Sequence, residues 1–464
     1  MSSEWITIPL GKVLTLQRGH DLPAQDRVAG GVPILGSSGI TGYHNESKAS
    51  GPGVTVGRSG NAMGEINYSD KGFWPLNTAL YVTDFKGNDP KFVYYLLKTI
   101  DFDQFNSGSA QKSLNRNAVY PFEVKIPRDF IEQRAISSVL SLLEDKIEIN
   151  HQINQTLEQM AQALFKSWFV DFEPVKAKIA ARQRWQALQP ENEPASPGCY
   201  AAELDGQSAT GGLESYMNRA AMQAIAGKTA AQLDALRAED PERYQEFYKT
   251  VALFPSAMQA SELGEIPEGW ETGSLSDLID FNPRRTLRKG ELAPYLDMKN
   301  VPTSGHLAEE VVQREMGSGT KFINGDTLLA RITPCLENGK TAFVDFLEDG
   351  ETGWGSTEYI ILRPTEAYPK SLGYFIARDE SFRSAAIQSM TGTSGRQRAD
   401  AKSLSGMKWL IYPPAIVGKF DLFASSYLRL ARNYGDQNKV LSKTRDALLP
   451  ELLSGNLTCP VLKE

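Results

Sequence analysis

A long internal repeat constrains this chain of 464 residues more than any other feature. A Trp-x4-Leu-x2-apolar motif begins at Trp5 and returns at Trp270, and each copy is followed further along the chain by a long stretch of helical periodicity. Solenoids and similar arrays repeat every ~20 to 50 residues, so a repeat of this length excludes them. The sequence therefore predicts two similar globular units, each followed by a long helix and joined head to tail.

Shorter matches support the alignment of the two copies. The matching pairs are 74–82 with 354–362, 94–96 with 374–376, and 108–109 with 392–393. Between these matches the two sequences diverge, which indicates one scaffold that carries two different surfaces.

Each copy combines short strands with a helix. In the first copy, residues 53–57 and 79–83 are typical of strands bounded by turns, a helix is expected after Asp89-Pro90, and residues 122–127 form a closing strand. The expected fold class is α+β, with two similar mixed α/β domains separated by a pair of long antiparallel helices that form a coiled-coil spacer. The expected segments are a first domain at 1–128, a first spacer-helix region at 129–186, an acidic linker or insert at 187–261, a second domain at 262–413, a second spacer-helix region at 414–455, and a tail at 456–464.

The predicted spacer helices carry a narrow apolar stripe. From Ile136, and again from Phe420, seven of nine positions counted in alternating steps of three and four are apolar. This average period of about 3.5 residues suits a coiled coil, in which isolated polar residues such as Lys146, Asn150 and Gln437 can set the register. The predicted interhelix contacts are Ile136, Val139, Leu143, Ile153, Leu157, Met160, Leu164, Phe420, Phe423, Tyr427, Leu430, Tyr434, Leu441 and Leu448.

The helix pair is expected to be antiparallel, because each helix must leave its own globular unit and return to the other. At a rise of about 1.5 Å per residue, about 40 helical residues give a rod of about 60 Å, long enough to act as a spacer. The alternative is that each stripe packs on its own domain, as amphipathic helices commonly do.

Residues 187–261 differ in composition from both copies. Residues 187–270 hold 13 acidic and 5 basic side chains, so the acidic excess behind the net charge of −7 is concentrated there. Pro and Gly residues indicate a linker in the first half, and 229–254 predicts one or two short helices, with Asp240 as N-cap and Pro241 at the first helical position. We expect an interdomain insert without chemistry of its own. The nearly neutral remainder permits a nucleic-acid partner.

Composition also argues against a membrane protein and a metalloprotein. No apolar run approaches ~18 residues, and Met1–Trp5 lacks the basic flank and apolar core of a signal peptide. The three cysteines, Cys199, Cys335 and Cys459, are far apart and odd in number, which favours neither a disulfide framework nor a metal site. We expect no structural metal and no membrane partner, and we expect the protein to be located in a reducing cytoplasm.

Catalytic motifs are fragmentary. Residues 339–341 end like a phosphate-binding loop, but Pro334 occupies the position of its first glycine. Asp103 and residues 123–125 have the spacing of a metal-dependent nuclease, yet they lie where the repeat requires an edge strand and are absent from the second copy. We therefore expect no catalytic site, and a nuclease is the weakest of the alternatives.

Polar glycine-rich loops occupy matching places in both copies. Residues 58–61 and 331–333 each follow a short apolar strand, and 108–117 matches 392–398. Arg and Lys pair with phosphates or guanine edges, and Asn and Gln pair with adenine. The candidate DNA-binding residues are Arg58, Asn61, Gln111, Lys112, Asn115, Arg116, Arg331, Arg396, Gln397 and Arg398. Any one of them could belong to a solvated turn, but the duplicated placement favours function.

Segments that flank the loops and helices resemble the specificity subunits of type I restriction-modification systems. The residues that carry the resemblance are Glu132-Gln133-Arg134-Ala135-Ile136, residues 163–172 (ALFKSWFVDF), residues 263–270 (LGEIPEGW), residues 445–450 (RDALLP) and residues 452–455 (LLSG). They lie in both halves of the chain and in both helical regions. The long acidic insert departs from the family pattern and leaves the geometry between the halves open.

The resemblance implies a non-catalytic chain that recognises double-stranded DNA. Two target-recognition domains would each read one half of a bipartite site. The helices would dock DNA methylation subunits, and we expect two such subunits. S-adenosylmethionine would be bound by the methylation subunits, and ATP and Mg²⁺ by the restriction and translocase subunits. The alternative function is a structural or protein-binding scaffold with paired helices.

Overall fold

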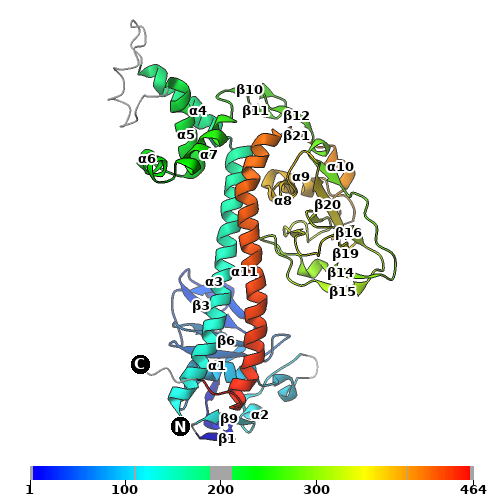
Figure 1. Ribbon diagram of the computed structural model, residues 1–464. Coiled ribbons are helices and arrows are strands. Elements are labelled where there is room, and N and C mark those ends of the chain that lie inside the picture. Colours follow the sequence, from blue (N-terminus) through cyan, green and yellow to red (C-terminus); the bar gives the residue numbers. More distant parts are fainter. Residues whose placement is uncertain (1–3, 109–110, 189–211, 394, 460–464) are drawn as a thin grey trace. The chain divides into compact units, whose positions relative to one another are not determined.

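The computed structural model describes residues 4–108, 111–188, 212–393 and 395–459 (Figure 1). The chain divides into two compact units: unit 1 consists of residues 1–150 and 436–464, and unit 2 of residues 151–435. The predicted features with residues outside the described ranges are the first domain (1–3), the two candidate loops (109–110 and 394), the insert (189–211) and the tail (460–464). Within the described residues, no helix is long and apolar enough to cross a membrane.

Unit 1 contains three groups of strands. An antiparallel pair joins β1 (Trp5–Pro9) to β9 (Glu123–Pro127), and so brings the two ends of the predicted first domain together. A four-stranded sheet has the order β2 (Thr15–Arg18), β8 (Ala79–Asp84), β5 (Gly53–Gly57) and β6 (Ile66–Ser69). A three-stranded sheet has the order β4 (Gly39–His44), β3 (Val32–Gly36) and β7 (Trp74–Pro75). Strand β5 is buried along its whole length, which suits its β-branched sequence.

Helix α1 (Pro90–Lys98) packs against this core and begins where the sequence predicts. The Asp89 carboxylate accepts a hydrogen bond from the Phe92 N–H at 2.7 Å, and Pro90 occupies a first-turn position. Phe92, Val93 and Leu96 bury the apolar face of the helix among the strands. The short helix α2 (Arg116–Val119) precedes β9.

Unit 2 repeats the three groups. Strand β12 (Glu271–Ser274) pairs antiparallel with β21 (Lys408–Ile411). One four-stranded sheet has the order β13 (Ile279–Phe281), β20 (Tyr359–Pro364), β17 (Thr327–Ala330) and β18 (Thr341–Phe343). The other has the order β15 (Val312–Glu315), β14 (Leu292–Leu296), β19 (Gly353–Gly355) and β16 (Thr320–Phe322). The helices that follow are α8 (Leu372–Arg378), α9 (Glu380–Gln388) and α10 (Ala401–Ser405).

The strand connectivity confirms that the chain is duplicated. Strands β3 and β7 pair in parallel, with Ile34 opposite Trp74, and β14 and β19 pair in parallel in unit 2, with Tyr295 opposite Trp354. Helix α1 follows β8 as α8 follows β20. The main addition in unit 2 is β16, which pairs with β19 and has no counterpart in unit 1 among the described strands.

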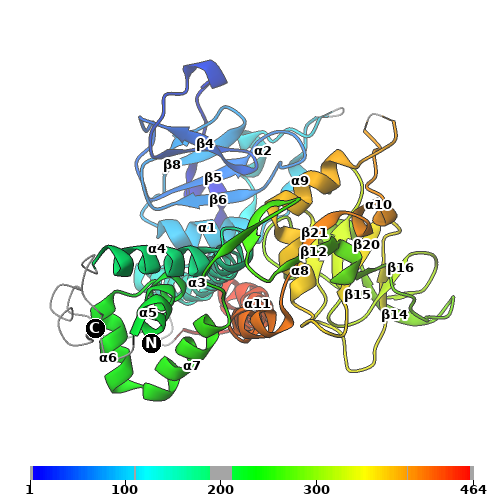
Figure 2. The same cartoon turned by 90° about the horizontal axis from the view of Figure 1, so that it is seen from above.

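Two helices of 40 and 41 residues provide the predicted spacer. Helix α3 (Phe130–Phe169) and helix α11 (Pro414–Ser454) run side by side in both ribbon views (Figure 1 and Figure 2). In unit 1, Asn150 donates hydrogen bonds to Gln437 and Asn438 at 2.7 and 2.8 Å. In unit 2, Phe165 packs on Phe420 with ring centroids 5.6 Å apart. Since later residues of α3 meet earlier residues of α11, the pair is antiparallel, and the predicted fold class is confirmed.

The buried positions along α3 and α11 are spaced by four and then three residues, whereas the prediction counted three and then four. Every second predicted position is therefore one residue too early. Met160 and Leu430 are 48% and 41% exposed, while the next residues, Ala161 and Ala431, are 0% and 4% exposed. The predictions for Met160 and Leu430 are wrong, because a count of large apolar residues passes over the alanines that fill a close helix contact.

The other predicted seam residues lie at least partly away from solvent. Three of them are buried: Ile136, Leu157 and Phe420. The half-buried ones are Val139, Leu143, Ile153, Leu164, Phe423, Tyr427, Tyr434, Leu441 and Leu448.

A buried tyrosine in each unit joins the strand-rich body to α3. In unit 1 the Tyr95 hydroxyl donates to the Glu144 carboxylate at 2.8 Å, and in unit 2 the Tyr374 hydroxyl donates to Glu158 at 2.6 Å. Both tyrosines are fully buried, and burial raises the pKa of each phenol above its ordinary value. A buried hydroxyl without a partner costs free energy, so each contact fixes where the body sits on its helix.

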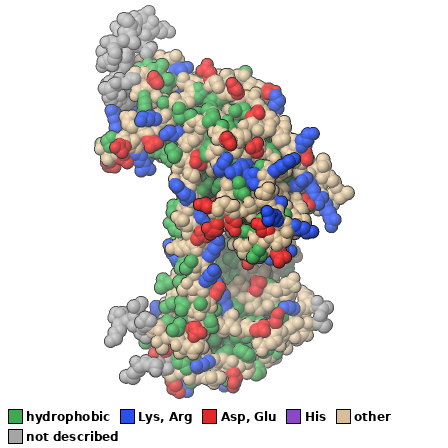
Figure 3. Space-filling model, turned by 45° about the vertical axis from the view of Figure 1, so that its right-hand side comes forward, with side chains coloured by type: hydrophobic (Ala, Val, Ile, Leu, Met, Phe, Trp, Pro, Cys, Tyr) green, Lys and Arg blue, Asp and Glu red, His purple; other side chains and the backbone are tan. Residues whose placement is uncertain are grey.

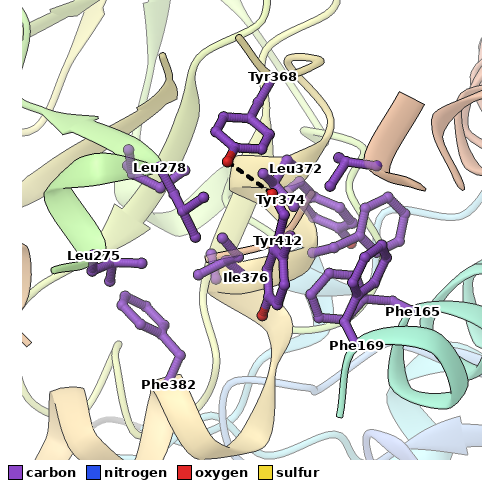
Figure 4. Packing of buried hydrophobic residues seen from close by; sticks show 14 of the residues in the cluster. Phe165, Phe169, Leu275, Leu278, Tyr368, Leu372, Tyr374, Ile376, Phe382 and Tyr412 are labelled. Carbon is purple, nitrogen blue, oxygen red and sulfur yellow. Dashed lines mark hydrogen bonds between the residues drawn. The ribbon is translucent and has the colours of Figure 1, made fainter. Parts of the chain in front are cut away.

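The aromatic residues at the end of α3 enter the core of unit 2. Figure 4 shows Phe165 and Phe169 beside Tyr374 and Tyr412. The Phe169 and Tyr412 ring centroids are 4.7 Å apart, and the hydroxyl of Tyr368 donates to the main-chain carbonyl of Tyr412 at 2.8 Å. These contacts explain why the end of the first helix region is so rich in aromatic residues.

The first helix region is not continuous. Helix α3 ends at Phe169, and Phe172 adopts a left-handed backbone with φ of 55° before α4 (Glu173–Ala187) begins. Pro174 lies in the first turn of α4, where its missing N–H is tolerated. Inside an uninterrupted helix, the same proline would remove a hydrogen bond and clash with the preceding turn. The helical pattern predicted as far as residue 185 therefore contains two helices.

The insert forms a small helical cluster with α4. One or two short helices were predicted at 229–254, and the structure has two, α6 (Ala230–Glu239) and α7 (Pro241–Ala252); the Asp240 side chain caps α7 as predicted. Helix α5 (Gly212–Ala226) and the hairpin of β10 (Met258–Ser261) and β11 (Gly264–Pro267) were not predicted. The cluster buries an apolar core, with Met222, Leu233 and Val251 at its centre.

Candidate nucleic-acid interface

The two candidate loops of unit 1 meet in the structure. The segment after β5 and the segment before α2 pair through their backbones, with Ser59 and Ser113 forming an antiparallel bridge. The Gly60 N–H donates to the Lys112 carbonyl at 3.0 Å, and the Leu114 N–H donates to the Arg58 carbonyl at 2.8 Å. Residues about 50 positions apart in the sequence thus form one continuous surface.

Unit 2 builds the same loop pair. Ile332 and Arg398 form the antiparallel bridge, the Thr333 N–H donates to the Gln397 carbonyl at 3.0 Å, and the Ala399 N–H donates to the Arg331 carbonyl at 2.8 Å. The equivalent positions are therefore Arg58 with Arg331, Lys112 with Gln397, and Ser113 with Arg398. Each loop pair has the same backbone frame, but the side chains on it differ.

A third segment and a helix cap complete both frames. The N–H of Arg58 donates to the Thr78 carbonyl and that of Arg331 to the Glu358 carbonyl, both at 2.9 Å. Asn115 caps α2 and Asp400 caps α10 through side-chain oxygens that accept main-chain N–H groups. These caps hold the second loop of each pair as it turns into the helix.

The candidate residues of unit 1 fall into two groups. Asn115 and Arg116 serve the fold, since Asn115 is the cap and the Arg116 guanidinium donates to the Leu16 carbonyl at 3.0 Å. Arg58 is half-buried, and its guanidinium donates to the Asn77 carbonyl at 3.4 Å. The remaining candidates, Asn61, Gln111 and Lys112, are exposed, as are Asn115 and Arg116.

Lys112 is exposed but paired. Its ammonium lies 2.7 Å from both carboxylate oxygens of Asp103, and the two side chains are 43% and 58% exposed. An ion pair this open to solvent contributes little to stability. A phosphate or base edge can therefore compete for Lys112 at small cost.

In unit 2, an ion pair organises the candidate residues. The Nε and Nη2 atoms of Arg398 lie 2.7–3.0 Å from the Glu358 carboxylate oxygens. These hydrogen bonds lower the pKa of the Glu358 carboxyl and raise the pKa of Arg398. Arg331 and Gln397 are half-buried beside the pair, and Arg396 is exposed. The Arg331 charge also lowers the pKa of Glu358.

A basic segment of unit 2 was not among the candidates. Residues 282–290, which connect β13 to β14, hold four basic side chains, of which Arg284, Arg288 and Lys289 are exposed. Arg285 is used within the fold, where it lies 3.1 Å from the buried Asp326. Figure 3 shows Lys and Arg side chains gathered on the strand-rich body of unit 2, beside Asp and Glu side chains. The local density of basic residues was a signal that the sequence offered.

The described residues contain no group of three or more His, Cys, Asp or Glu side chains that could hold a metal ion. The polar side chains at both loop pairs are hydrogen-bond donors and acceptors suited to phosphates and base edges.

Comparison with known proteins shows the fold of the chain and a family match for its first third. Residues 2–159 match the type I restriction modification DNA specificity domain. The chain is 38% identical over 200 residues to the specificity subunit of the type I restriction enzyme HindI from Haemophilus influenzae, which covers 41% of this chain and 38% of that protein. It is 30% identical over 206 residues to the EcoEI specificity subunit from Escherichia coli, covering 42% and 33%. The aligned parts thus span less than two fifths of these relatives.

A solved structure resembles the chain along nearly its whole length. The S subunit of a type I restriction-modification system from M. genitalium aligns with a TM-score of 0.53 at 13% identity, covering 97% of this chain and 96% of that one. This likeness shows the fold alone. The first third of the chain is therefore similar to the type I restriction modification DNA specificity domain, and the chain as a whole has the fold of that S subunit.

Proposed function

We propose that this chain is the DNA-reading subunit of a type I restriction-modification complex and that each unit reads one half of a bipartite site. The observation that carries the proposal is the duplicated loop pair, in which one set of backbone hydrogen bonds presents two different sets of side chains. Phosphate contacts position a protein on DNA, and side chains that reach base edges select the sequence. Two similar frames with different side chains suit two unlike half-sites.

The helices supply a spacer between the two reading surfaces. A fixed separation of reading surfaces sets a fixed spacing between half-sites, as in other two-part DNA readers. We further propose that α3 and α11 dock two methylation subunits, and that restriction and translocase subunits join this assembly. In the proposed assembly, those partners bind S-adenosylmethionine, ATP and Mg²⁺, and this chain itself is not catalytic. The resemblance of residues 2–159 to DNA specificity domains supports this division of labour.

A cell-based measurement tests the site directly. Methylome sequencing of a cell with and without this chain should show the loss of one split methylated motif with a constant gap. Unchanged methylation would contradict the proposal.

A binding measurement separates DNA reading from the scaffold alternative. The full chain, together with methylation subunits, should shift DNA containing the split motif in a mobility assay, and the affinity should fall as salt rises because bound counterions are released. Lys112→Ala should weaken the shift, whereas Lys408→Ala, which breaks a similarly exposed pair between β21 and Glu262, should not. A chain that binds methylation subunits but no DNA would favour the scaffold.

A further inference from the structure

The equivalence of the two loop pairs singles out one side-chain pair. Where unit 2 has Glu358 and Arg398, the matching backbone positions of unit 1 are occupied by Thr78 and Ser113. Unit 1 therefore has two hydroxyls where unit 2 has a carboxylate and a guanidinium. The frame is shared, so this difference lies in the side chains alone.

The geometry of the ion pair leaves part of it available. Nε and Nη2 of Arg398 are used by Glu358, whereas Nη1 makes only a long contact of 3.4 Å with the Arg396 carbonyl. On the other side, Oε1 of Glu358 accepts from both Arg398 nitrogens and Oε2 from Nε alone. A carboxylate oxygen has two lone-pair sites, so Oε2 can accept a further hydrogen bond. The pair presents a donor and an acceptor side by side.

This donor and acceptor fit a G·C base pair, since Arg pairs with guanine O6 and N7 and Glu accepts from the cytosine amino group. In the major groove, guanine shows the acceptors N7 and O6, and its partner cytosine shows the N4 donor. Building on the proposed DNA-reading function, we propose that Glu358 and Arg398 are the specificity-determining pair of unit 2 and together recognise a G·C base pair. Arg398 donates to guanine, and Glu358 both orients Arg398 and accepts from cytosine.

Exposure and restraint agree with this role. The Arg398 and Glu358 side chains are 42% and 24% exposed, so the pair is reachable from solvent while its carboxylate is largely enclosed. Three hydrogen bonds from two nitrogens to one carboxylate hold the guanidinium plane in a single orientation, which lowers the entropy lost when it binds a base. The equivalent hydroxyls of Thr78 and Ser113 both donate and accept, and so do not select G·C in this way.

The test uses the full chain with methylation subunits and a pool of double-stranded oligonucleotides with two randomised blocks. Bound DNA is sequenced for the wild type, Glu358→Gln, Arg398→Lys and the control Asp234→Asn. The control breaks another Arg–carboxylate pair of unit 2, between Arg219 and Asp234 in the helical cluster. Lys112→Ala marks the half-site that belongs to unit 1.

We expect the wild type to select a G·C pair in the half-site of unit 2, and Glu358→Gln to reduce that selection by about tenfold or more. Arg398→Lys keeps a positive charge but loses the planar set of N–H donors of the guanidinium, and should reduce the same selection. The half-site of unit 1 and the Asp234→Asn profile should not change. If thermal melting shows that Glu358→Gln is unfolded, Arg398→Lys decides.

An unchanged base profile in both variants overturns the inference, even if affinity falls equally for every sequence, because a purely structural ion pair would do that. A wild type that binds specifically but selects no G·C pair in this half-site overturns it too, and leaves the proposed function intact. A wild type without any sequence-specific binding overturns both.

Discussion

Units 1 and 2 share a loop frame but hold the spacer helices by different means. In unit 2, α3 meets α11 and the strand-rich body through rings, with Phe165, Trp168 and Phe420 fully or almost fully buried. In unit 1 the two helices also meet through amides near the middle of each helix, with Asn150 and Asn438 buried. The aromatic end gains from the area that it buries, whereas buried amides favour one register at a cost in stability. One helix pair thus combines a stabilising aromatic end with a register-setting amide contact.

The largest effect should come from the aromatic end. Phe165→Ala removes a ring that touches Phe375, Tyr412 and Phe420, and should lower the free energy of unfolding by about 3–5 kcal/mol. Hydrogen exchange should rise in β17 and β20, which belong to unit 2, and change little in β2 and β8 of unit 1. Equal acceleration in both units would show that they unfold together, which would break the comparison.

Substitutions at the amide contact should have the opposite effect when both amides are removed. Asn150→Leu leaves the buried Asn438 amide oxygen without its donor, and should cost about 1–3 kcal/mol. The double variant Asn150→Leu with Asn438→Leu should recover most of that loss or exceed the wild type, because buried amides cost stability in a helix seam. Urea denaturation measures both. A double variant that is less stable than the single one would show that the amides stabilise the pair.

Single loop substitutions sharpen the comparison at the candidate interface. Lys112→Ala in unit 1 and Arg398→Ala in unit 2 should each weaken DNA binding by about 1–3 kcal/mol if the side chain reads a base. The two losses should fall on different half-sites, which competition with half-site mutants can assign. Losses confined to the same half-site would contradict one reading surface per unit.

The smallest effect concerns pH and the helical cluster of unit 2. Burial lowers the pKa of Lys178 to about 8, while its ammonium donates to the Phe254 carbonyl at 2.6 Å. Below pH 8 the folded chain carries the cost of a buried charge. Between pH 8 and the unfolded value of 10.5, the unfolded chain binds more protons, so stability should rise with pH.

Thermal melting across that range should show the rise in the wild type, and Lys178→Met should reduce it. The control Lys176→Met changes an exposed lysine of the same helix and should keep the rise. A rise of the same size in Lys178→Met would mean that groups other than Lys178 cause the increase in stability with pH.

Much of the architecture followed from local rules. The Asp89-Pro90 helix start, the Asp240 cap and the buried strand at 53–57 were predicted because capping chemistry and β-branched runs act over a few residues. Loop equivalence was also predictable, since the match of residues 108–109 with 392–393 aligned the segments that the structure pairs. The β10–β11 hairpin and α5 were missed, because their stability comes from packing within unit 2.

The candidate site was predictable in place but not in role. Asn115 and Arg116 have the residue types of base readers, yet the structure uses one as a helix cap and the other to hold a backbone carbonyl. Glu358 was not a candidate, because a lone glutamate 40 positions from Arg398 gives no signal until the strands bring the two together.

By itself the sequence determined the duplication, the fold class and the presence of two long helices, because repeats and helical periodicity can be read from the order of residues along the chain. Only the tertiary structure decided which face of each helix is buried. Ala161 and Ala431 are buried whereas the larger apolar residues Met160 and Leu430 face solvent, so hydrophobicity alone does not decide which positions are buried. It also decided which loop residues remain free to bind, since hydrogen bonds between distant segments engage some of them and expose the rest.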